Sequence, residues 1–177
     1  MRILRFSLFA ILSAVLLCAG DVPRDAPDLK LKTTSGETLT LAALKGKVVA
    51  VMWFSTDCPH CQSTSELMGP IYADLKSKGL EIVGCTVNPS APGNIDAFES
   101  KHGVKFPIGI SNSADWMRFA DMSIAARAFV PYMMIIDRSG VIRYEHPGKD
   151  RVFWTDQEVQ MRKEFGELLA ERPGASD

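Results

Sequence analysis

The sequence has no excess of one sign of charge. Its 177 residues carry 20 Lys and Arg side chains against 21 Asp and Glu, which gives a formal net charge of −1. Binding to nucleic acid or to an anionic membrane surface relies on a clear excess of clustered basic side chains. We therefore expect no nucleic acid among the partners. Nothing in the sequence resembles a nucleotide or flavin site either, so neither a nucleotide cofactor nor any other bound cofactor is implied.

Cysteine and histidine are scarce. The chain has four cysteines and three histidines, and so few cysteines do not make the disulfide-stapled scaffold of a small exported domain. A zinc site built on Cys58 and Cys61 would need two further ligands. His60 lies between these two cysteines, while His102 is expected at a helix end and His146 in a turn. This arrangement favours redox chemistry over structural zinc.

A long apolar run occurs only at the start of the chain. Two arginines precede the apolar stretch Phe6–Leu17, and small residues follow it. This pattern predicts a secretory signal peptide over residues 1–20, cut after Gly20, because the run is shorter than the roughly 20 residues that a spanning helix needs. Export, to the periplasm of a bacterium, is therefore expected. Anchoring in the membrane, by this run or by acylation of Cys18, is the less favoured alternative.

Hydrophobic periodicity divides the remaining chain into strands and helices. Continuous apolar runs predict buried strands at 48–55 and 81–87, and helical spacing after Cys61 predicts a helix that ends at Gly79. Further expected elements are a hairpin over 29–33 and 37–41, a helix capped by Asn94 and ending at Gly103, a strand at 106–110, a helical segment over 113–129, paired strands at 132–136 and 141–144, and a last helix opened by a Thr155–Glu158 capping box.

These elements predict an α/β fold with a central mixed β-sheet flanked by helices and an N-terminal β-hairpin extension. No internal repeat or long linker divides the chain. One domain is therefore expected over 21–170, followed by a flexible tail at 171–177.

The segment from Trp53 to Cys61, with the sequence WFSTDCPHC, carries the candidate chemistry. A buried strand leads into a short loop that brings Cys58 to the start of the next helix, where free N–H groups and the helix dipole favour a thiolate over a thiol. Cys61 follows on the same face and can attack a mixed disulfide formed by Cys58. Pro59 suits the first helical turn. We expect a redox-active disulfide; the alternatives are a structural disulfide, which would close a very small loop and add little stability, and two unlinked core cysteines.

Four sets of residues resemble one family. They are Ala26-Pro27-Asp28, Leu41-x-x-Leu44-x-Gly46-Lys47, the Trp53–Cys61 segment, and Val130-Pro131 followed by Ile135-Ile136-Asp137-Arg138-Ser139-Gly140-Val141-Ile142. Together they resemble the thioredoxin superfamily, and most of all its exported TlpA/ResA-like branch with a domain of the AhpC/TSA-redoxin type. The resemblance covers about Asp25 to Glu171. It implies a thioredoxin-like fold, exchange of electrons with protein thiols and disulfides, and a membrane-bound redox partner.

The resemblance also assigns roles around the cysteine pair. It implies that Pro131 is cis and stands opposite the pair, which leaves the backbone of Val130 free to bind an incoming peptide. Phe54, an aromatic of the core or of the site rim, joins Val130 as a candidate substrate contact. Two positions depart from the family pattern: Thr64 stands where a glutamate is common, and Met52 where a polar residue is common. The proton-transfer partner of the second cysteine is therefore left open.

His60 bears on the direction of electron flow. An imidazolium beside the pair stabilises the thiolate of Cys58 and so makes the disulfide a stronger oxidant. The Pro59-His60 dipeptide is the one found in the oxidant DsbA, whose potential is about −120 mV against about −270 mV for thioredoxin. The rest of the chain resembles reductases. We favour the reductase or interchange direction, with a DsbA-like oxidase as the alternative.

Two other functions remain open on the same fold. A peroxiredoxin-like peroxidase would accept Ser55 but needs a proline where Val51 stands. A metal-binding chaperone would hold a soft ion such as Cu(I) between Cys58, Cys61 and His60.

Cys85 lies inside an apolar run and is expected to be a buried, inert thiol. The alternative is a third redox thiol.

Overall fold

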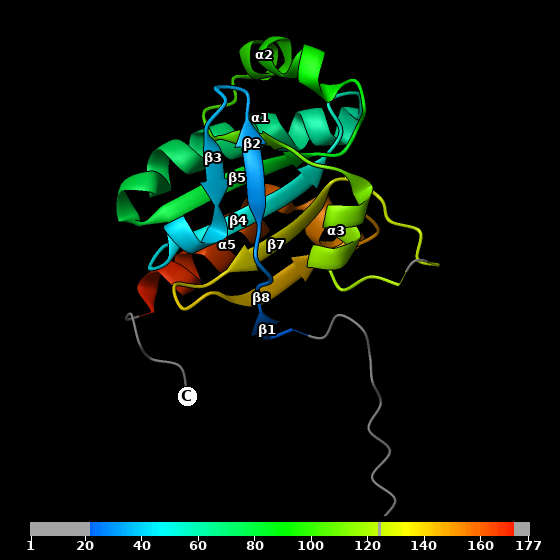
Figure 1. Cartoon of the computed structure of the whole chain (residues 1–177). Helices are drawn as coiled ribbons and strands as arrows, with labels where there is room; N and C mark the ends of the chain where they lie inside the picture. The colour runs from blue at the N-terminus through cyan, green and yellow to red at the C-terminus, as the bar shows by residue number, and fades with distance from the viewer. Residues whose placement is uncertain (1–21, 124, 172–177) are drawn as a thin grey trace, which may run out of the picture.

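The computed structural model describes residues 22–123 and 125–171, which form alternating strands and helices (Figure 1). The expected signal peptide and the last residues of the expected tail lie outside this part of the chain. The strands are β1 (Arg24–Asp25), β2 (Lys30–Thr33), β3 (Thr38–Thr40), β4 (Val48–Phe54), β5 (Leu80–Thr86), β6 (Ile108–Ile110), β7 (Tyr132–Ile136) and β8 (Val141–His146). The helices are α1 (Pro59–Leu75), α2 (Ala91–His102), α3 (Ser113–Phe119), α4 (Arg151–Thr155) and α5 (Gln157–Ala170), with the short 3-10 helices η1 (Leu41–Leu44) and η2 (Lys76–Lys78).

The described strands form one mixed sheet in the order β1-β8-β7-β4-β5-β6-β2-β3. Strands β4, β5 and β6 run parallel to one another, and the other pairs are antiparallel. All residues of β4, β5 and β7 are buried, as their continuous apolar sequences predict for strands covered on both faces. The mixed α/β sheet flanked by helices is therefore confirmed.

Alternate side chains of β4 enter two separate apolar clusters, because successive residues of a strand point to opposite faces. One cluster lies between the sheet and the helices α1, α2, α4 and α5, and the other lies under α3 and the β2–β3 hairpin. In Figure 1, α1 and α5 lie behind the sheet and α3 lies in front of it. The first cluster receives Val48, Ala50, Met52 and Phe54, and the second receives Val49, Val51 and Trp53.

The N-terminal hairpin extension is confirmed by the antiparallel pairing of β2 with β3, and β2 also pairs with β6. Gly109 in β6 makes this second pairing possible. A Cβ atom at position 109 would lie 2.5 Å from the Cβ of Leu31, which is closer than two carbon atoms approach without bonding. Any other residue at Gly109 would push the hairpin away from the sheet.

Two predicted helix boundaries are wrong. Helix α2 begins at Ala91, before Asn94, with a proline in its first turn. The helical segment expected to reach residue 129 stops at Phe119, and Asp121 then adopts a positive φ of 50°, a conformation that ends helices.

The predicted Thr155–Glu158 capping box does not form. Thr155 is instead the last residue of α4, and Asp156 precedes α5 without a side-chain cap. The cap that does form lies upstream, where Asp150 accepts a hydrogen bond from the backbone N–H of Phe153 at 3.1 Å. An earlier aspartate therefore starts an extra short helix.

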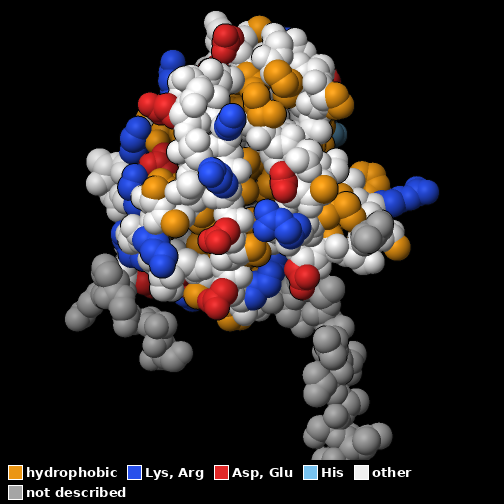
Figure 2. Space-filling model, in the orientation of Figure 1, with side chains coloured by type: hydrophobic (Ala, Val, Ile, Leu, Met, Phe, Trp, Pro, Cys, Tyr) orange, Lys and Arg blue, Asp and Glu red, His pale blue; other side chains and the backbone are white. Residues whose placement is uncertain are grey.

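Basic and acidic side chains are interspersed over the face shown in Figure 2. Glu171, at the end of the described part of the chain, forms an ion pair with Arg143 at 3.1 Å. Among residues 22–123 and 125–171, no helix combines the length and the apolar character needed to cross a bilayer.

Candidate functional site

The β4–α1 junction places Cys58 at the first position before a helix. Its backbone N–H donates to the carbonyl of Ser55 at 3.2 Å, and its own carbonyl accepts from Gln62 at 3.0 Å, which is the first bond of α1. Pro59 is the first helical residue, as predicted. The thiol of Cys58 therefore lies where unpaired N–H groups and the positive end of the helix dipole meet.

Cys58 and Cys61 lie in contrasting environments, and both are thiols in this structure. Cys58 is partly exposed, whereas Cys61 is 0% exposed. Burial raises the pKa of the Cys61 thiol well above its usual range; a backbone hydrogen bond from Ser55 opposes this, and a hydrogen bond with Cys58 and the charge of Cys58 add to it. Cys58 is thus the accessible nucleophile, and Cys61 keeps its proton until later.

The segment before β7 faces this pair. The Val130–Pro131 peptide bond is cis, as the resemblance implied, and the Sγ of Cys58 lies 3.9 Å from the carbonyl oxygen of Val130. Val130 is partly exposed. A cavity of about 160 Å³ beside the cysteines is lined by the exposed His60, the partly exposed Val130 and the buried Pro131. The structure therefore brings Cys58 together with five other residues expected at its site, Pro59, His60, Cys61, Val130 and Pro131, but not with the expected aromatic.

That aromatic is Phe54, which the sequence suggested as a substrate contact. Phe54 is 0% exposed, and its ring packs against that of Phe98 with 5.2 Å between centroids. A side chain without exposed surface cannot touch a substrate, so Phe54 is a core residue. The prediction failed because a residue next to a reactive loop can point to either face of its strand.

Sequence reasoning missed a polar network behind the cysteine loop. The side-chain carbonyl of Asn88 accepts from the backbone N–H of Thr56 at 3.1 Å, and its amide group donates to Thr56 Oγ1 at 2.8 Å. Asp57, next to Cys58, accepts from Ser90 at 2.9 Å. Asn88 is the second residue after β5, the parallel neighbour of β4. Polar residues just after such strands gather at one edge of a sheet. The position of Asn88 just after a buried strand could therefore have predicted this network from the sequence.

His146 was expected in a turn and is instead a buried residue at the end of β8. Its Nδ1 lies 3.0 Å from Asp150 and its Nε2 lies 2.9 Å from Glu164, while Phe153 stacks on the ring at 3.6 Å. Burial alone would lower the pKa of His146, but the hydrogen bonds to Glu164 and Asp150 outweigh burial and raise it. His102 does end a helix, as predicted, and pairs with Glu66 at 2.8 Å.

Cys85 is 0% exposed, and burial raises the pKa of its thiol. It belongs to the cluster under α3 together with Trp53, whereas Cys61 belongs to the cluster on the other face of the sheet. The expected burial is confirmed. Because the sheet stands between Cys85 and Cys61, Cys85 is not placed to exchange with the pair.

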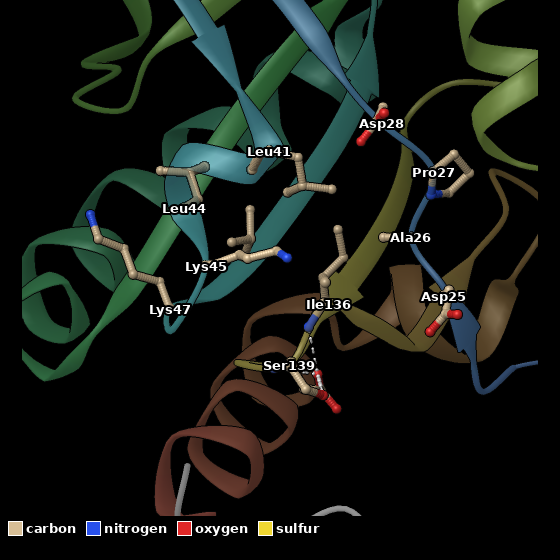
Figure 3. Close-up of a pocket in the computed structure, with 14 residues that line it drawn as sticks. Asp25, Ala26, Pro27, Asp28, Leu41, Leu44, Lys45, Lys47, Ile136 and Ser139 are labelled. Carbon is tan, nitrogen blue, oxygen red and sulfur yellow. Dashed lines mark hydrogen bonds between the residues drawn. The ribbon is translucent and has the colours of Figure 1, made fainter. Parts of the chain in front are cut away.

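A cavity of about 350 Å³ lies at the other end of the sheet (Figure 3). It is lined by residues before and at the start of β4, such as Lys47 and Val49, and by residues at the end of β7. Cys58 follows the opposite end of β4, so this cavity is remote from the thiols. Within the described part of the chain, no group of three or more His, Cys, Asp or Glu side chains is arranged to share a metal ion.

Comparison with known proteins identifies the family. A family model described as Redoxin matches residues 21–161. The chain belongs to the Redoxin family. Solved structures with the same arrangement confirm the thioredoxin-like fold; a putative thiol:disulfide interchange protein DsbE from Chlorobium tepidum superposes on this redoxin with a TM-score of 0.67 at 22% identity, covering 82% of this chain and 99% of that one.

Curated relatives place this redoxin in the TlpA/ResA-like part of the thioredoxin superfamily. The thiol-disulfide oxidoreductase ResA of Bacillus subtilis is 31% identical over 106 residues, which make up 60% of this chain and 59% of ResA. The ResA of Halalkalibacterium halodurans is 28% identical over 145 residues, or 81% of this chain and 74% of that protein. The matched part of the chain thus spans less than two thirds of the length of the first relative. The resemblance seen in the sequence is confirmed at the level of the family.

Proposed function

We propose that this redoxin is an exported thiol–disulfide oxidoreductase that exchanges electrons with protein thiols and disulfides through Cys58 and Cys61. The observation that carries the proposal is the asymmetric pair at the start of α1. A partly exposed Cys58 lies 3.9 Å from the carbonyl of Val130, and a fully buried Cys61 follows three residues later. The ResA relatives are thiol-disulfide oxidoreductases by name, which supports the same chemistry here.

The proposed reaction has two exchange steps. The thiolate of Cys58 attacks one sulfur of a substrate disulfide, forms a mixed disulfide and releases the first substrate thiolate. Cys61 then loses its proton and attacks the sulfur of Cys58, which forms the Cys58–Cys61 disulfide and releases the second thiolate. The two released thiolates take up two protons, so the substrate gains two electrons and the pair loses two. No bound cofactor takes part in this scheme.

Val130 and Pro131 are proposed to orient the substrate. A polypeptide bound beside Cys58 can pair its backbone with that of Val130, a partly exposed residue, as an added strand does at a sheet edge. His60 is exposed next to the pair, where its positive form would stabilise the Cys58 thiolate. We propose the reductase or interchange direction, with a membrane-bound dithiol protein as electron donor after export. The His60 position favours a second candidate, a dithiol oxidase.

The proposal is tested by trapping the intermediate. Reduced Cys61→Ser protein, incubated with a disulfide-containing protein substrate, should accumulate a mixed disulfide through Cys58, because the second thiol that resolves it is gone. Cys58→Ser should form none, and Cys85→Ala should turn over like the unaltered protein. Mass spectrometry identifies the linked cysteine. If Cys58→Ser retained full activity, the proposal would be wrong, and metal content measured on the purified protein would then test the chaperone alternative.

A further inference from the structure

Part of the wall of the 160 Å³ cavity beside the cysteines comes from α4 and α5, two helices that do not carry the reactive thiols. His60 and Thr64 from α1, together with Val130 and Pro131, form one side. Trp154 of α4 and Gln157 of α5 form the other. Since the Sγ of Cys58 lies 3.9 Å from the carbonyl of Val130, a polypeptide joined to Cys58 through its own cysteine would bring a neighbouring side chain to this cavity.

Trp154 provides a fixed apolar surface. Its indole N–H donates to the carbonyl of Pro147 at 2.7 Å, and its ring meets Phe153 edge-on with 4.7 Å between centroids. The single polar atom of the indole is therefore engaged within the protein. A substrate side chain bound in the cavity would therefore contact the ring of Trp154, which favours apolar and aromatic groups.

Gln157 provides the polar end of the cavity. The hydroxyl oxygen of Thr64 lies 2.9 Å from the carbonyl of His60 and 2.8 Å from the Gln157 side-chain amide. The Thr64 hydroxyl donates to the His60 carbonyl and to the Oε1 atom of Gln157, so the amide oxygen of Gln157 is engaged within the protein. The amino group of Gln157 has no hydrogen-bond partner among the described residues and is left as a donor.

The charge of the lining residues and the volume of the cavity further restrict which side chains can bind there. Among the described residues that line the cavity, none is a carboxylate and His60 alone is ionisable, so a cationic side chain would find no counter-charge. The volume of about 160 Å³ is close to that of the engineered cavities of about 150 Å³ that hold benzene. An aromatic ring with a hydrogen-bond acceptor at its tip matches the apolar wall and the donor together.

We propose that this cavity is a specificity subsite for a neutral residue next to the reacting cysteine of the substrate, with an apolar body and a hydrogen-bond acceptor at its end; tyrosine, whose hydroxyl oxygen accepts, fits best. The inference rests on the proposed function, since the guest is delivered by a mixed disulfide at Cys58. Trp154 packs against the guest and the amino group of Gln157 donates a hydrogen bond to it.

Short disulfide-linked peptides test the subsite with the full chain. The peptides differ only in the residue beside cysteine, which is Tyr, Phe, Lys or Gly, and oxidised glutathione serves as a reference disulfide without an apolar side chain beside its cysteine. The rate constant for oxidation of the Cys58–Cys61 pair is measured for each. The tyrosine peptide should react about tenfold faster than the glycine peptide, a ratio typical of one well-placed contact, with phenylalanine between them and lysine close to glycine.

Variants assign the preference to individual side chains. Gln157→Leu should bring tyrosine down to the rate of phenylalanine, and Trp154→Ala should remove both preferences. Gln157→Glu should raise the lysine peptide above glycine, a gain that a merely structural role for Gln157 would not produce. Val159→Ala, on the same helix, 67% exposed and outside the cavity, is the matched control. Val159→Ala should react with every peptide and with oxidised glutathione at the unaltered rate, and each variant's peptide rates are compared as ratios to its own rate with oxidised glutathione.

Two results would overturn the inference in different ways. Equal rates for all four peptides, with normal reaction with glutathione, would remove the subsite and leave the proposed function standing. Failure to react with glutathione or any peptide would remove the proposed function and the subsite with it.

Discussion

Cys58 and Cys61 have identical side chains and differ only in where the start of α1 places them. Three residues along a helix return to the same face, but Cys58 precedes the helix at the surface and Cys61 is 0% exposed. The order of attack follows from this difference. Burial raises the pKa of Cys61, so Cys61 remains protonated while Cys58 reacts with a substrate.

A substitution of Cys85 tests whether this buried thiol takes part in disulfide exchange. Cys85→Ala should leave the rate of disulfide exchange unchanged, because the sheet separates this thiol from Cys61. It should lower the free energy of unfolding by about 1–2 kcal/mol, since a buried sulfur is lost from a packed cluster. Denaturant unfolding and turnover are measured on the same preparation. A clear loss of turnover in a normally folded variant would restore Cys85 as a redox thiol.

His146 carries a pH-dependent contribution to stability. Its pKa is raised above the ordinary 6.5 by Glu164 and Asp150, which outweigh the opposing effect of burial. The folded protein therefore binds this proton more tightly than the unfolded chain, so the stabilisation is complete below about pH 6.5 and is lost as the pH rises through the folded pKa. NMR titration of the His146 ring should give a pKa above 6.5, and His146→Gln should flatten this part of the pH–stability curve. A pKa below 6.5 would contradict the prediction.

At the scale of elements, the loop from Pro147 to Asp150 joins β8 to the wall of the proposed subsite. It is held at one end by His146 and at the other by the Asp150 cap of α4. In between, Gly148 packs on the segment before Pro131: a Cβ atom at position 148 would lie 2.3 Å from the carbonyl oxygen of Phe129. Only glycine allows the two segments to lie so close together.

Gly148→Ala should therefore destabilise the protein by about 1–3 kcal/mol, because backbone atoms must separate to admit one methyl group. It should also slow the exchange reaction with peptide disulfides, since the segment that carries Val130 moves with the loop. Gly166→Ala in α5 is the control: nothing lies within 4 Å of its added Cβ, and alanine favours a helix over glycine. Thermal unfolding of both variants tests this. Equal melting temperatures would show that the close approach at Gly148 is not required.

The sequence predicted strands and helices correctly where a single strong pattern determined the local structure. The apolar run of β4 and the turn at Asp137 to Gly140 each allowed one interpretation, and both strands around that turn form as predicted. The helices failed where two local signals competed, since Asp150 rather than Thr155 provides the cap that forms. Helical spacing around Trp116 predicted too long a helix, because it does not reveal that Asp121 takes a positive φ.

At the scale of the whole molecule, the sheet divides the protein into two apolar clusters and collects the candidate site at one edge. The sequence predicted Cys58, Cys61 and Pro131, since each belongs to a short continuous motif. It could not predict Trp154 and Gln157, which reach the site only through packing of α4 and α5 against α1. It also misassigned Phe54, because the face of β4 that each residue occupies depends on what covers the sheet.

The central claim is that Cys58 and Cys61 form a reversible redox couple, and the most direct test is the reduction potential of the pair. Protein lacking residues 1–20 is equilibrated with glutathione buffers, and the fraction of disulfide is measured. We predict one two-electron couple, unchanged in Cys85→Ala and closer to the value of about −270 mV of thioredoxin than to the value of about −120 mV of DsbA. A value near that of DsbA would reverse the proposed direction of electron flow, and the absence of any reversible couple would contradict the account.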